Sequence, residues 1–120
     1  GILDDKIIGI MEIISDKEIY NYKNKYIKIA THNLNPNLPK RIEKEMTDIS
    51  LLAHESIKCN CISRLDFRYS EKNEEVFLLE TNTQPGLTKN SLLPEMAYNK
   101  GINFLKLCET ILANSKCEKV

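Results

Sequence analysis

Two acidic residues and an asparagine near the ends of two neighbouring strand-like runs have the chemistry of a metal site. Asp66 lies in "SRLDF", and Glu80 and Asn82 end the second run in "LLETN". Mg²⁺ prefers carboxylate and amide oxygens, and it takes one or two carboxylates while leaving its other positions to water and phosphate. Arg64 stands two positions before Asp66 and therefore shares its strand face. The alternative is an exposed, salt-bridged strand end with no ligand.

The residues that follow Asn82 favour a functional site. They read "TQPGLTKNSLLPE" and place a Pro85-Gly86 turn ahead of Ser91. A glycine lets the backbone approach a ligand closely, and a helix that begins at Ser91 offers free N–H groups to an anion. Candidate metal ligands, an arginine and an anion site therefore fall close together in the sequence.

An antiparallel hairpin is predicted to position these polar side chains. Its strand-like runs are joined by a charged turn near Glu71 to Glu74. If the turn centres near Lys72, Arg64 lies opposite Glu80 and Asp66 is a diagonal neighbour of Glu80. The polar groups would then cluster at one end of the hairpin.

Three helices are predicted beside this hairpin, which makes the fold α/β of the α+β kind, mainly an antiparallel sheet packed with helices. The first follows Pro39 and runs to about Lys58, the second spans about Ser91 to Asn99, and the third follows Gly101. The side chains expected in the core are Ile42, Met46, Ile49, Ala53, Ile57, Phe77, Leu78, Leu79, Phe104, Leu107, Cys108, Ile111 and Leu112.

The beginning of the chain reads "GILDDKIIGIMEII" and predicts a hairpin with its turn at Asp4-Asp5, cut at its first strand. We therefore expect the chain to start within a larger fold. Residues 20–37 show no clean period and predict a long loop with a short strand at its start. Loops of this length are usually functional or disordered.

Composition argues against several classes of protein. The 17 basic and 17 acidic residues are interspersed, so no basic stripe indicates nucleic-acid binding. The longest apolar runs are far shorter than the roughly 20 residues that cross a bilayer, and no signal peptide is recognisable. We expect a soluble, cytoplasmic protein without a membrane or nucleic-acid partner.

Cysteine and histidine are too few and too scattered for a zinc site or a disulfide framework. We expect reduced, packed cysteines and histidines that are bystanders. These residues are Cys59, Cys61, Cys108, Cys117, His32 and His54.

The stretch from Glu80 to Leu92 resembles the motif E-x-N-T-x-P-G-x-T-x-x-S-L of D-alanine:D-alanine ligases, enzymes of the ATP-grasp superfamily. The similarity includes "SRLDF" and covers nearly the whole chain. "YNYKNKY" at residues 20–26 resembles the family's Y-D-Y-x-x-K-Y element, which belongs to a loop closing over the active site. The resemblance implies that residues 1–120 are the C-terminal portion of the ATP-grasp catalytic domain, with the N-terminal and central nucleotide-lid domains absent.

The resemblance also implies a reaction. Such ligases phosphorylate the carboxylate of one D-alanine with ATP, and the amine of a second D-alanine attacks the acyl phosphate, which yields the dipeptide for peptidoglycan. Two Mg²⁺ ions, or Mn²⁺ in their place, would be bound by Asp66, Glu80 and Asn82, with Glu80 bridging them. Arg64 and the Gly86 N–H would stabilise the oxyanion of the tetrahedral intermediate.

Four further residues acquire roles by the same resemblance. Ser91 and the Leu92 N–H would hold the carboxylate of the second D-alanine. Lys25 would contact ATP phosphate, and Tyr26 would lie over the second substrate. Asn90 departs from the family, which commonly has histidine just before the serine.

D-alanine, ATP and the missing remainder of the enzyme are the partners that the resemblance implies, and the intact enzyme would be a monomer or a homodimer. The isolated chain is expected to be inactive. The alternative is an inactive remnant, or a binding or assembly module, that retains the metal-site residues without turnover. A glycine-rich lid encoded upstream in frame would favour a cut piece, and its absence would favour a remnant.

Overall fold

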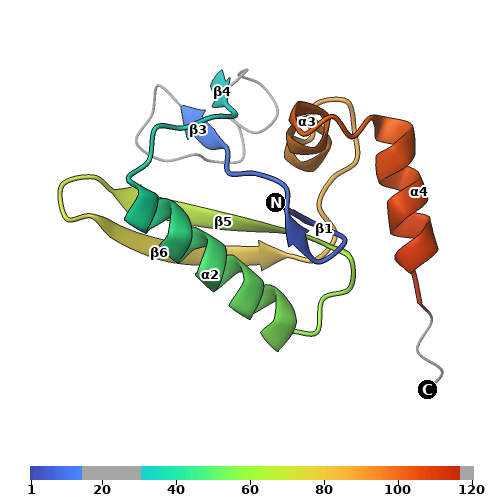
Figure 1. Ribbon diagram of the computed structural model, residues 1–120, viewed down its shortest axis with the longest axis horizontal. Helices are drawn as coiled ribbons and strands as arrows, with labels where there is room; N and C mark the ends of the chain where they lie inside the picture. The colour runs from blue at the N-terminus through green and yellow to red at the C-terminus, as the bar shows by residue number, and fades with distance from the viewer. Residues whose placement is uncertain (15–30, 117–120) are drawn as a thin grey trace.

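The computed structural model describes residues 1–14 and 31–116, which form two antiparallel sheets and three helices (Figure 1). The sheets have the strand orders β2-β1-β5-β6 and β3-β4. This arrangement confirms the predicted α+β class. The described elements are β1 (Ile2–Leu3), β2 (Lys6–Ile7), β3 (Glu12–Ile14), β4 (Thr31–Asn33), α2 (Lys40–Ser56), β5 (Ile62–Ser70), β6 (Glu75–Asn82), α3 (Leu92–Asn99) and α4 (Phe104–Asn114).

The N-terminal hairpin is confirmed and forms one edge of the larger sheet. Asp4 and Asp5 make its turn with φ of 51° and 56°, a left-handed conformation that aspartate tolerates through its short polar side chain. β1 also pairs with β5, where Ile2 lies opposite Ser63. The hairpin therefore brings Asp5 close to the beginning of β5.

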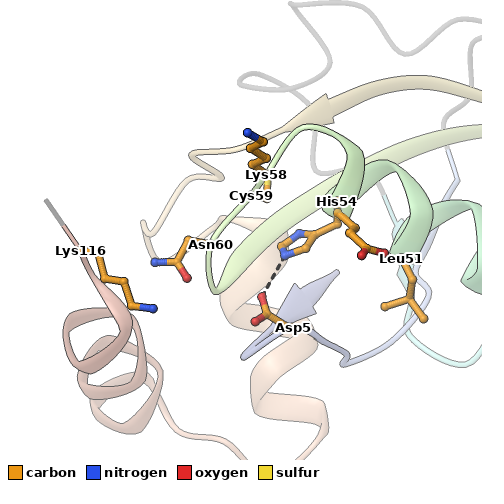
Figure 2. A pocket seen from close by; sticks show the side chains of 8 residues that line it. Asp5, Leu51, His54, Lys58, Cys59, Asn60 and Lys116 are labelled. Carbon is orange, nitrogen blue, oxygen red and sulfur yellow. Dashed lines mark hydrogen bonds and ion pairs between the residues drawn. The ribbon is translucent and has the colours of Figure 1, made fainter. Parts of the chain in front are cut away.

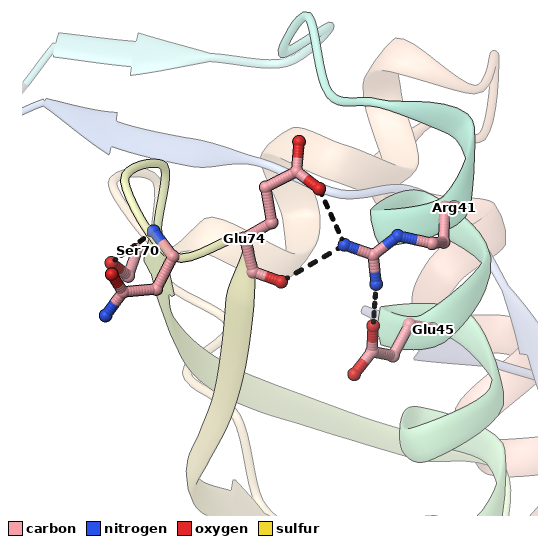
Figure 3. A network of polar contacts seen from close by, with 5 residues as sticks. Arg41, Glu45, Ser70 and Glu74 are labelled. Atoms are coloured by element: carbon pink, nitrogen blue, oxygen red, sulfur yellow. Dashed lines mark hydrogen bonds and ion pairs between the residues drawn. The ribbon is translucent and has the colours of Figure 1, made fainter.

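A turn over residues 71–74 joins β5 to β6, as predicted. Arg41, at the start of α2, donates to the Glu74 carboxylate at 2.9 Å, to the Glu74 carbonyl at 3.3 Å and to Glu45 at 3.3 Å (Figure 3). Glu74 itself has a left-handed φ of 51°. Because these side chains are exposed, the contacts orient the turn and contribute little to the free energy of unfolding.

The register of the β5–β6 hairpin differs from the prediction. Asp66 lies directly opposite Glu80, and Arg64 lies opposite Asn82 instead of Glu80. A register shift beyond Asp66 leaves Leu79 without a cross-strand partner, as in a β-bulge. Because of this shift, each residue pair between Phe67 and the turn is displaced by one position. The alternation of apolar and polar residues in the sequence does not predict such a displacement.

Helix α2 covers one face of the sheet (Figure 1). Its buried side chains are Ile42, Met46, Ser50 and His54, each four residues from the next. The predicted apolar stripe is confirmed at its start, where Ile42 and Met46 are buried. It is wrong at its end, because Ile57 is 51% exposed. Polar side chains occupy the rest of the buried stripe, and His54 can lie there because both of its ring nitrogens have partners.

The main core lies where β1 and β2 meet α3 and α4. Its buried members are Leu3, Ile8, Cys61, Leu93, Met96, Ala97 and Leu107. Several side chains predicted to be core are instead exposed because they lie on faces that no described element covers. These are Phe77 (51% exposed), Leu79 (65%), Phe104 (52%) and Leu112 (73%).

The long loop is described only in part. Residues 20–30, including Lys25 and Tyr26 and the short strand predicted at the start of the loop, lie outside the described residues. The described end contains an unpredicted strand, β4, which pairs with β3. Within residues 1–14 and 31–116, none of the helices has the length and apolar character that crossing a membrane requires.

Candidate active site

Four of the predicted site residues converge on one face of the β5–β6 hairpin. Arg64 pairs with Asn82, and Asp66 pairs with Glu80. Side chains two residues apart in a strand share a face, and directly opposed residues are nearest neighbours across a ladder. The predicted cluster is therefore present, although its register differs from the one expected.

Arg64 links the two carboxylates of this cluster. Its Nε and a terminal nitrogen donate to the two oxygens of Asp66 at 2.7 and 2.8 Å, which is a bidentate pair. A terminal nitrogen also lies 3.7 Å from Glu80 Oε1. The Arg64 side chain is only 12% exposed, so its charge acts in a partly water-excluded setting.

The oxygen atoms of this cluster suit a hard divalent cation whose remaining coordination positions are filled by water or phosphate. No group of three histidine, cysteine, aspartate or glutamate side chains that could hold a metal occurs in the described part of the chain. Asp66 and Glu80 supply two carboxylates, and Asn82 adds an amide oxygen that already accepts from the Gln84 N–H at 3.0 Å. Such a set fits Mg²⁺, which completes its coordination with water and phosphate.

The Pro-Gly turn brings Gly86 against Ser91. A Cβ at Gly86 would lie 2.7 Å from Ser91 Oγ, so only glycine permits this approach without a shift of the serine. Ser91 Oγ accepts from the Thr88 N–H at 3.0 Å and lies 2.7 Å from Thr88 Oγ1. The serine hydroxyl is therefore fixed within the loop.

Helix α3 begins with backbone N–H groups that its own N-cap side chain leaves uncapped. Ser91 is the N-cap residue, but its hydroxyl turns to Thr88 and makes no capping hydrogen bond. Leu92 and Leu93 thus present N–H groups at the positive end of the helix dipole, whereas Pro94 has none to present. The predicted second cluster, which comprises Gly86, Ser91 and Leu92, is suited to an anion.

His54 has buried structural partners that the sequence analysis did not predict. It is 5% exposed, and its Nδ1 lies 2.7 Å from Ser63 Oγ. Its Nε2 lies 3.0 Å from Asp5 Oδ1 (Figure 2). The order Asp-His-Ser is that of a hydrolase triad, but Ser63 has no exposed surface and cannot meet a substrate. The His54 contacts, which we call the buried link, instead connect the Asp4-Asp5 turn and α2 to Ser63, the residue that precedes Arg64.

A groove of about 710 Å³ runs past this link (Figure 2). Asp5, Leu51, His54, Lys58 and Lys116 are among its lining residues, and none of the predicted site residues that the structure describes lines it. Its lining includes two acidic residues, Asp5 and Glu55, and two lysines, Lys58 and Lys116, so the groove favours neither an anion nor a cation. The candidate site remains the two clusters described above.

Replacing His54 tests the buried link. His54→Leu in the full-length protein removes both ring nitrogens and leaves the Ser63 hydroxyl buried without its partner, which we expect to cost about 1–3 kcal/mol. The measurement is the urea midpoint of unfolding. The double variant His54→Leu, Ser63→Ala removes the stranded hydroxyl and should recover part of the loss. A double variant no more stable than His54→Leu would contradict this account.

The described cysteines are free, as predicted: Cys59, Cys61 and Cys108. Burial raises the pKa of the Cys59 and Cys61 thiols above the ordinary value. Both therefore stay protonated at neutral pH and are weak nucleophiles. Cys117 lies outside the described residues.

Comparison with known proteins identifies the family of the chain. The family described as "D-ala D-ala ligase C-terminus" matches residues 1–113. A D-alanine-D-alanine ligase of Pelagibacter ubique is 40% identical over 121 residues, with 99% of this chain and 39% of the relative covered. A D-alanine-D-alanine ligase of Acidiphilium cryptum is 36% identical over 118 residues, with 98% of this chain and 39% of the relative covered.

Solved structures agree with the sequence comparison. A Bacillus anthracis D-alanine-D-alanine ligase matches 94% of this chain and 37% of its own, with a TM-score of 0.77 and 29% identity. A structure of the Bacillus anthracis ligase complexed with ATP matches with a TM-score of 0.74 and 26% identity. The match covers 94% of this chain and 34% of the ligase chain. The chain spans about two fifths of the length of these curated relatives (39%). This chain belongs to the family of D-alanine:D-alanine ligase C-terminal regions, within the ATP-grasp fold.

Proposed function

We propose that the enzyme containing this chain joins two D-alanines at the expense of ATP, through an acyl phosphate, and supplies the dipeptide for peptidoglycan. The convergence of Arg64, Asp66, Glu80 and Asn82 on one strand face supports this proposal most directly. The relatives from Pelagibacter ubique and Acidiphilium cryptum carry the ligase name, and one matching structure was solved with ATP. Because ATP is the phosphoryl donor, we place the reaction in the cytoplasm.

Residues 1–120 would form the C-terminal portion of the catalytic domain, and the activity would belong to the whole enzyme. The chain covers 39% of these relatives, so we propose that it is inactive alone. Asp66, Glu80 and Asn82 would hold two divalent cations, with Glu80 shared between them. When bound, Mg²⁺ or Mn²⁺ neutralises charge on the transferring phosphoryl group.

Arg64 would act on the oxyanion that forms when the second amine attacks the acyl phosphate. The bidentate contact with Asp66 fixes the guanidinium plane, and its low exposure strengthens the interaction with a developing negative charge. The Gly86 N–H would be the second donor to that oxygen. The absent side chain at Gly86 keeps the approach open.

Ser91 and the Leu92 N–H would bind the carboxylate of the acceptor D-alanine at the start of α3. The fixed hydroxyl and the uncapped N–H groups support this assignment. Lys25 is proposed to contact ATP phosphate, and Tyr26 is proposed to cover the acceptor. Both lie outside the described residues and rest on the resemblance alone.

A ligation assay on the full-length enzyme tests the proposal. We expect D-alanyl-D-alanine and ADP to form together, only when ATP, D-alanine and a divalent cation are all present. Ser91→Ala should raise the KM for the acceptor about tenfold or more, because it removes a hydrogen bond to a charged group. Ser115→Ala, at the end of α4, is the matched control and should behave like the parent. A parent enzyme that fails to ligate D-alanine under these conditions would overturn the function.

A further inference from the structure

His32 and Glu95 form a close polar pair outside the residues that the resemblance assigns. His32 lies in β4 and Glu95 in α3, 63 positions apart, with Nδ1 and Oε2 separated by 2.5 Å. The side chains are 20% and 38% exposed. An ionised carboxylate can only accept, so the ring nitrogen donates the hydrogen bond. The sequence analysis assigned His32 no role and did not predict this contact.

Glu95 lies close to the end of α3 that is proposed to bind the acceptor. It is the acidic residue of the first turn, four positions after Ser91. Residues four apart share one side of a helix, and helical side chains lean toward the N-terminus. The Glu95 carboxylate therefore leans toward the helix start, where it competes with any bound anion for the positive end of the dipole.

We propose that His32 is a positioning residue that holds the Glu95 carboxylate through the hydrogen bond from Nδ1, so that the start of α3 can receive the carboxylate of the acceptor D-alanine. The inference rests on the proposed function. Without His32, the free Glu95 charge would repel the substrate carboxylate. The pair thus sets acceptor affinity without contacting the substrate.

A purely structural role for the pair is less consistent with how α3 is held. Leu93 and Ala97 have no exposed surface and Met96 is 4% exposed, so the core fixes the helix on its opposite side. Loss of one partly exposed hydrogen bond should leave the helix in place. The effect of removing His32 is therefore electrostatic and local to the helix start.

The test measures acceptor KM, ATP KM and melting temperature in the full-length enzyme. His32→Gln should raise the acceptor KM about three- to tenfold, the size expected for a charge near a helix terminus, with ATP KM and melting temperature unchanged. His32→Arg keeps a side chain that can donate a hydrogen bond to the Glu95 carboxylate and should restore the parental acceptor KM. Arg41→Gln is the matched control and should leave both KM values unchanged. It removes the cation that pairs with Glu74 in the β5–β6 turn and with Glu45 in α2, and that turn lies away from α3 (Figure 1).

The decisive variants remove the carboxylate. Glu95→Gln alone should leave the acceptor KM at or below the parental value, and the double variant His32→Gln, Glu95→Gln should return to it. A raised KM in Glu95→Gln would instead mean that the pair only holds the structure, and would overturn the proposal even if His32→Gln failed to fold. If Ser91→Ala changes the acceptor KM and His32→Gln does not, this inference is overturned and the proposed function stands. If the parent enzyme has no ligase activity, the proposed function is overturned.

Discussion

Glu80→Gln is expected to lower the turnover of the full-length enzyme at least about a hundredfold at saturating ATP, D-alanine and Mg²⁺. The substitution keeps the shape of the side chain but removes the charge that two cations would share. Glu80 lies opposite Asp66 and 3.7 Å from Arg64, and the other carboxylate of β6, Glu75, lies at the opposite end of that strand and cannot take its place. Steady-state release of ADP measures the loss.

Glu75→Gln is the matched control for this experiment. Glu75 is an exposed glutamate at the other end of β6, where it pairs with Ser70 and accepts from Asn73. Its removal should leave turnover within a factor of about two, as is usual for surface substitutions. Turnover of Glu80→Gln within a few-fold of the parent would reject the metal assignment.

Arg64→Lys is expected to lower the rate of dipeptide formation by about 10²–10³, the usual loss on removing an oxyanion donor. A lysine keeps the charge but cannot reproduce the fork that holds both oxygens of Asp66 at 2.7 and 2.8 Å. The acyl phosphate would still form and would then be lost to water. The ratio of ADP released to dipeptide formed should therefore rise above the parental value.

Arg68→Lys provides the comparison for Arg64→Lys. Arg68 lies on the same strand, opposite Phe77, beyond the register shift. The same substitution there should change neither the rate of dipeptide formation nor the ratio of ADP to dipeptide. An unchanged ratio in Arg64→Lys, or an equal effect of both variants, would remove Arg64 from the proposed oxyanion role.

Local chemistry made several elements predictable from sequence. The Asp4-Asp5 turn was recognisable because few residues other than glycine, asparagine and aspartate adopt two successive left-handed conformations. Helix α2 was recognisable from its apolar period and from Pro39, and the β5–β6 turn from its run of charges. The four polar residues of the first cluster were predicted to lie together, and they do.

Features that depend on tertiary partners were not predictable. The burial of His54 requires Ser63 and Asp5 as partners, which are 9 and 49 positions away. The exposure of Phe77 and Leu79 follows from the absence of a covering element on that face among the described residues, and no local pattern reports this. The pairing of β4 with β3 is likewise set across a gap in sequence rather than by local propensity.

The bulge at Leu79 makes the hairpin's tolerance of insertions and deletions unequal on its two sides. A deletion of one residue on the turn side of Glu80 can be absorbed by loss of the bulge, which restores a regular ladder with Glu80 still opposite Asp66. A deletion between Glu80 and Asn82 has no spare residue to draw on and would send Asn82 to the opposite face. Homologous hairpins can therefore vary in length toward the turn and keep the same polar partners, while the segment from Glu80 to Asn82 must keep its spacing.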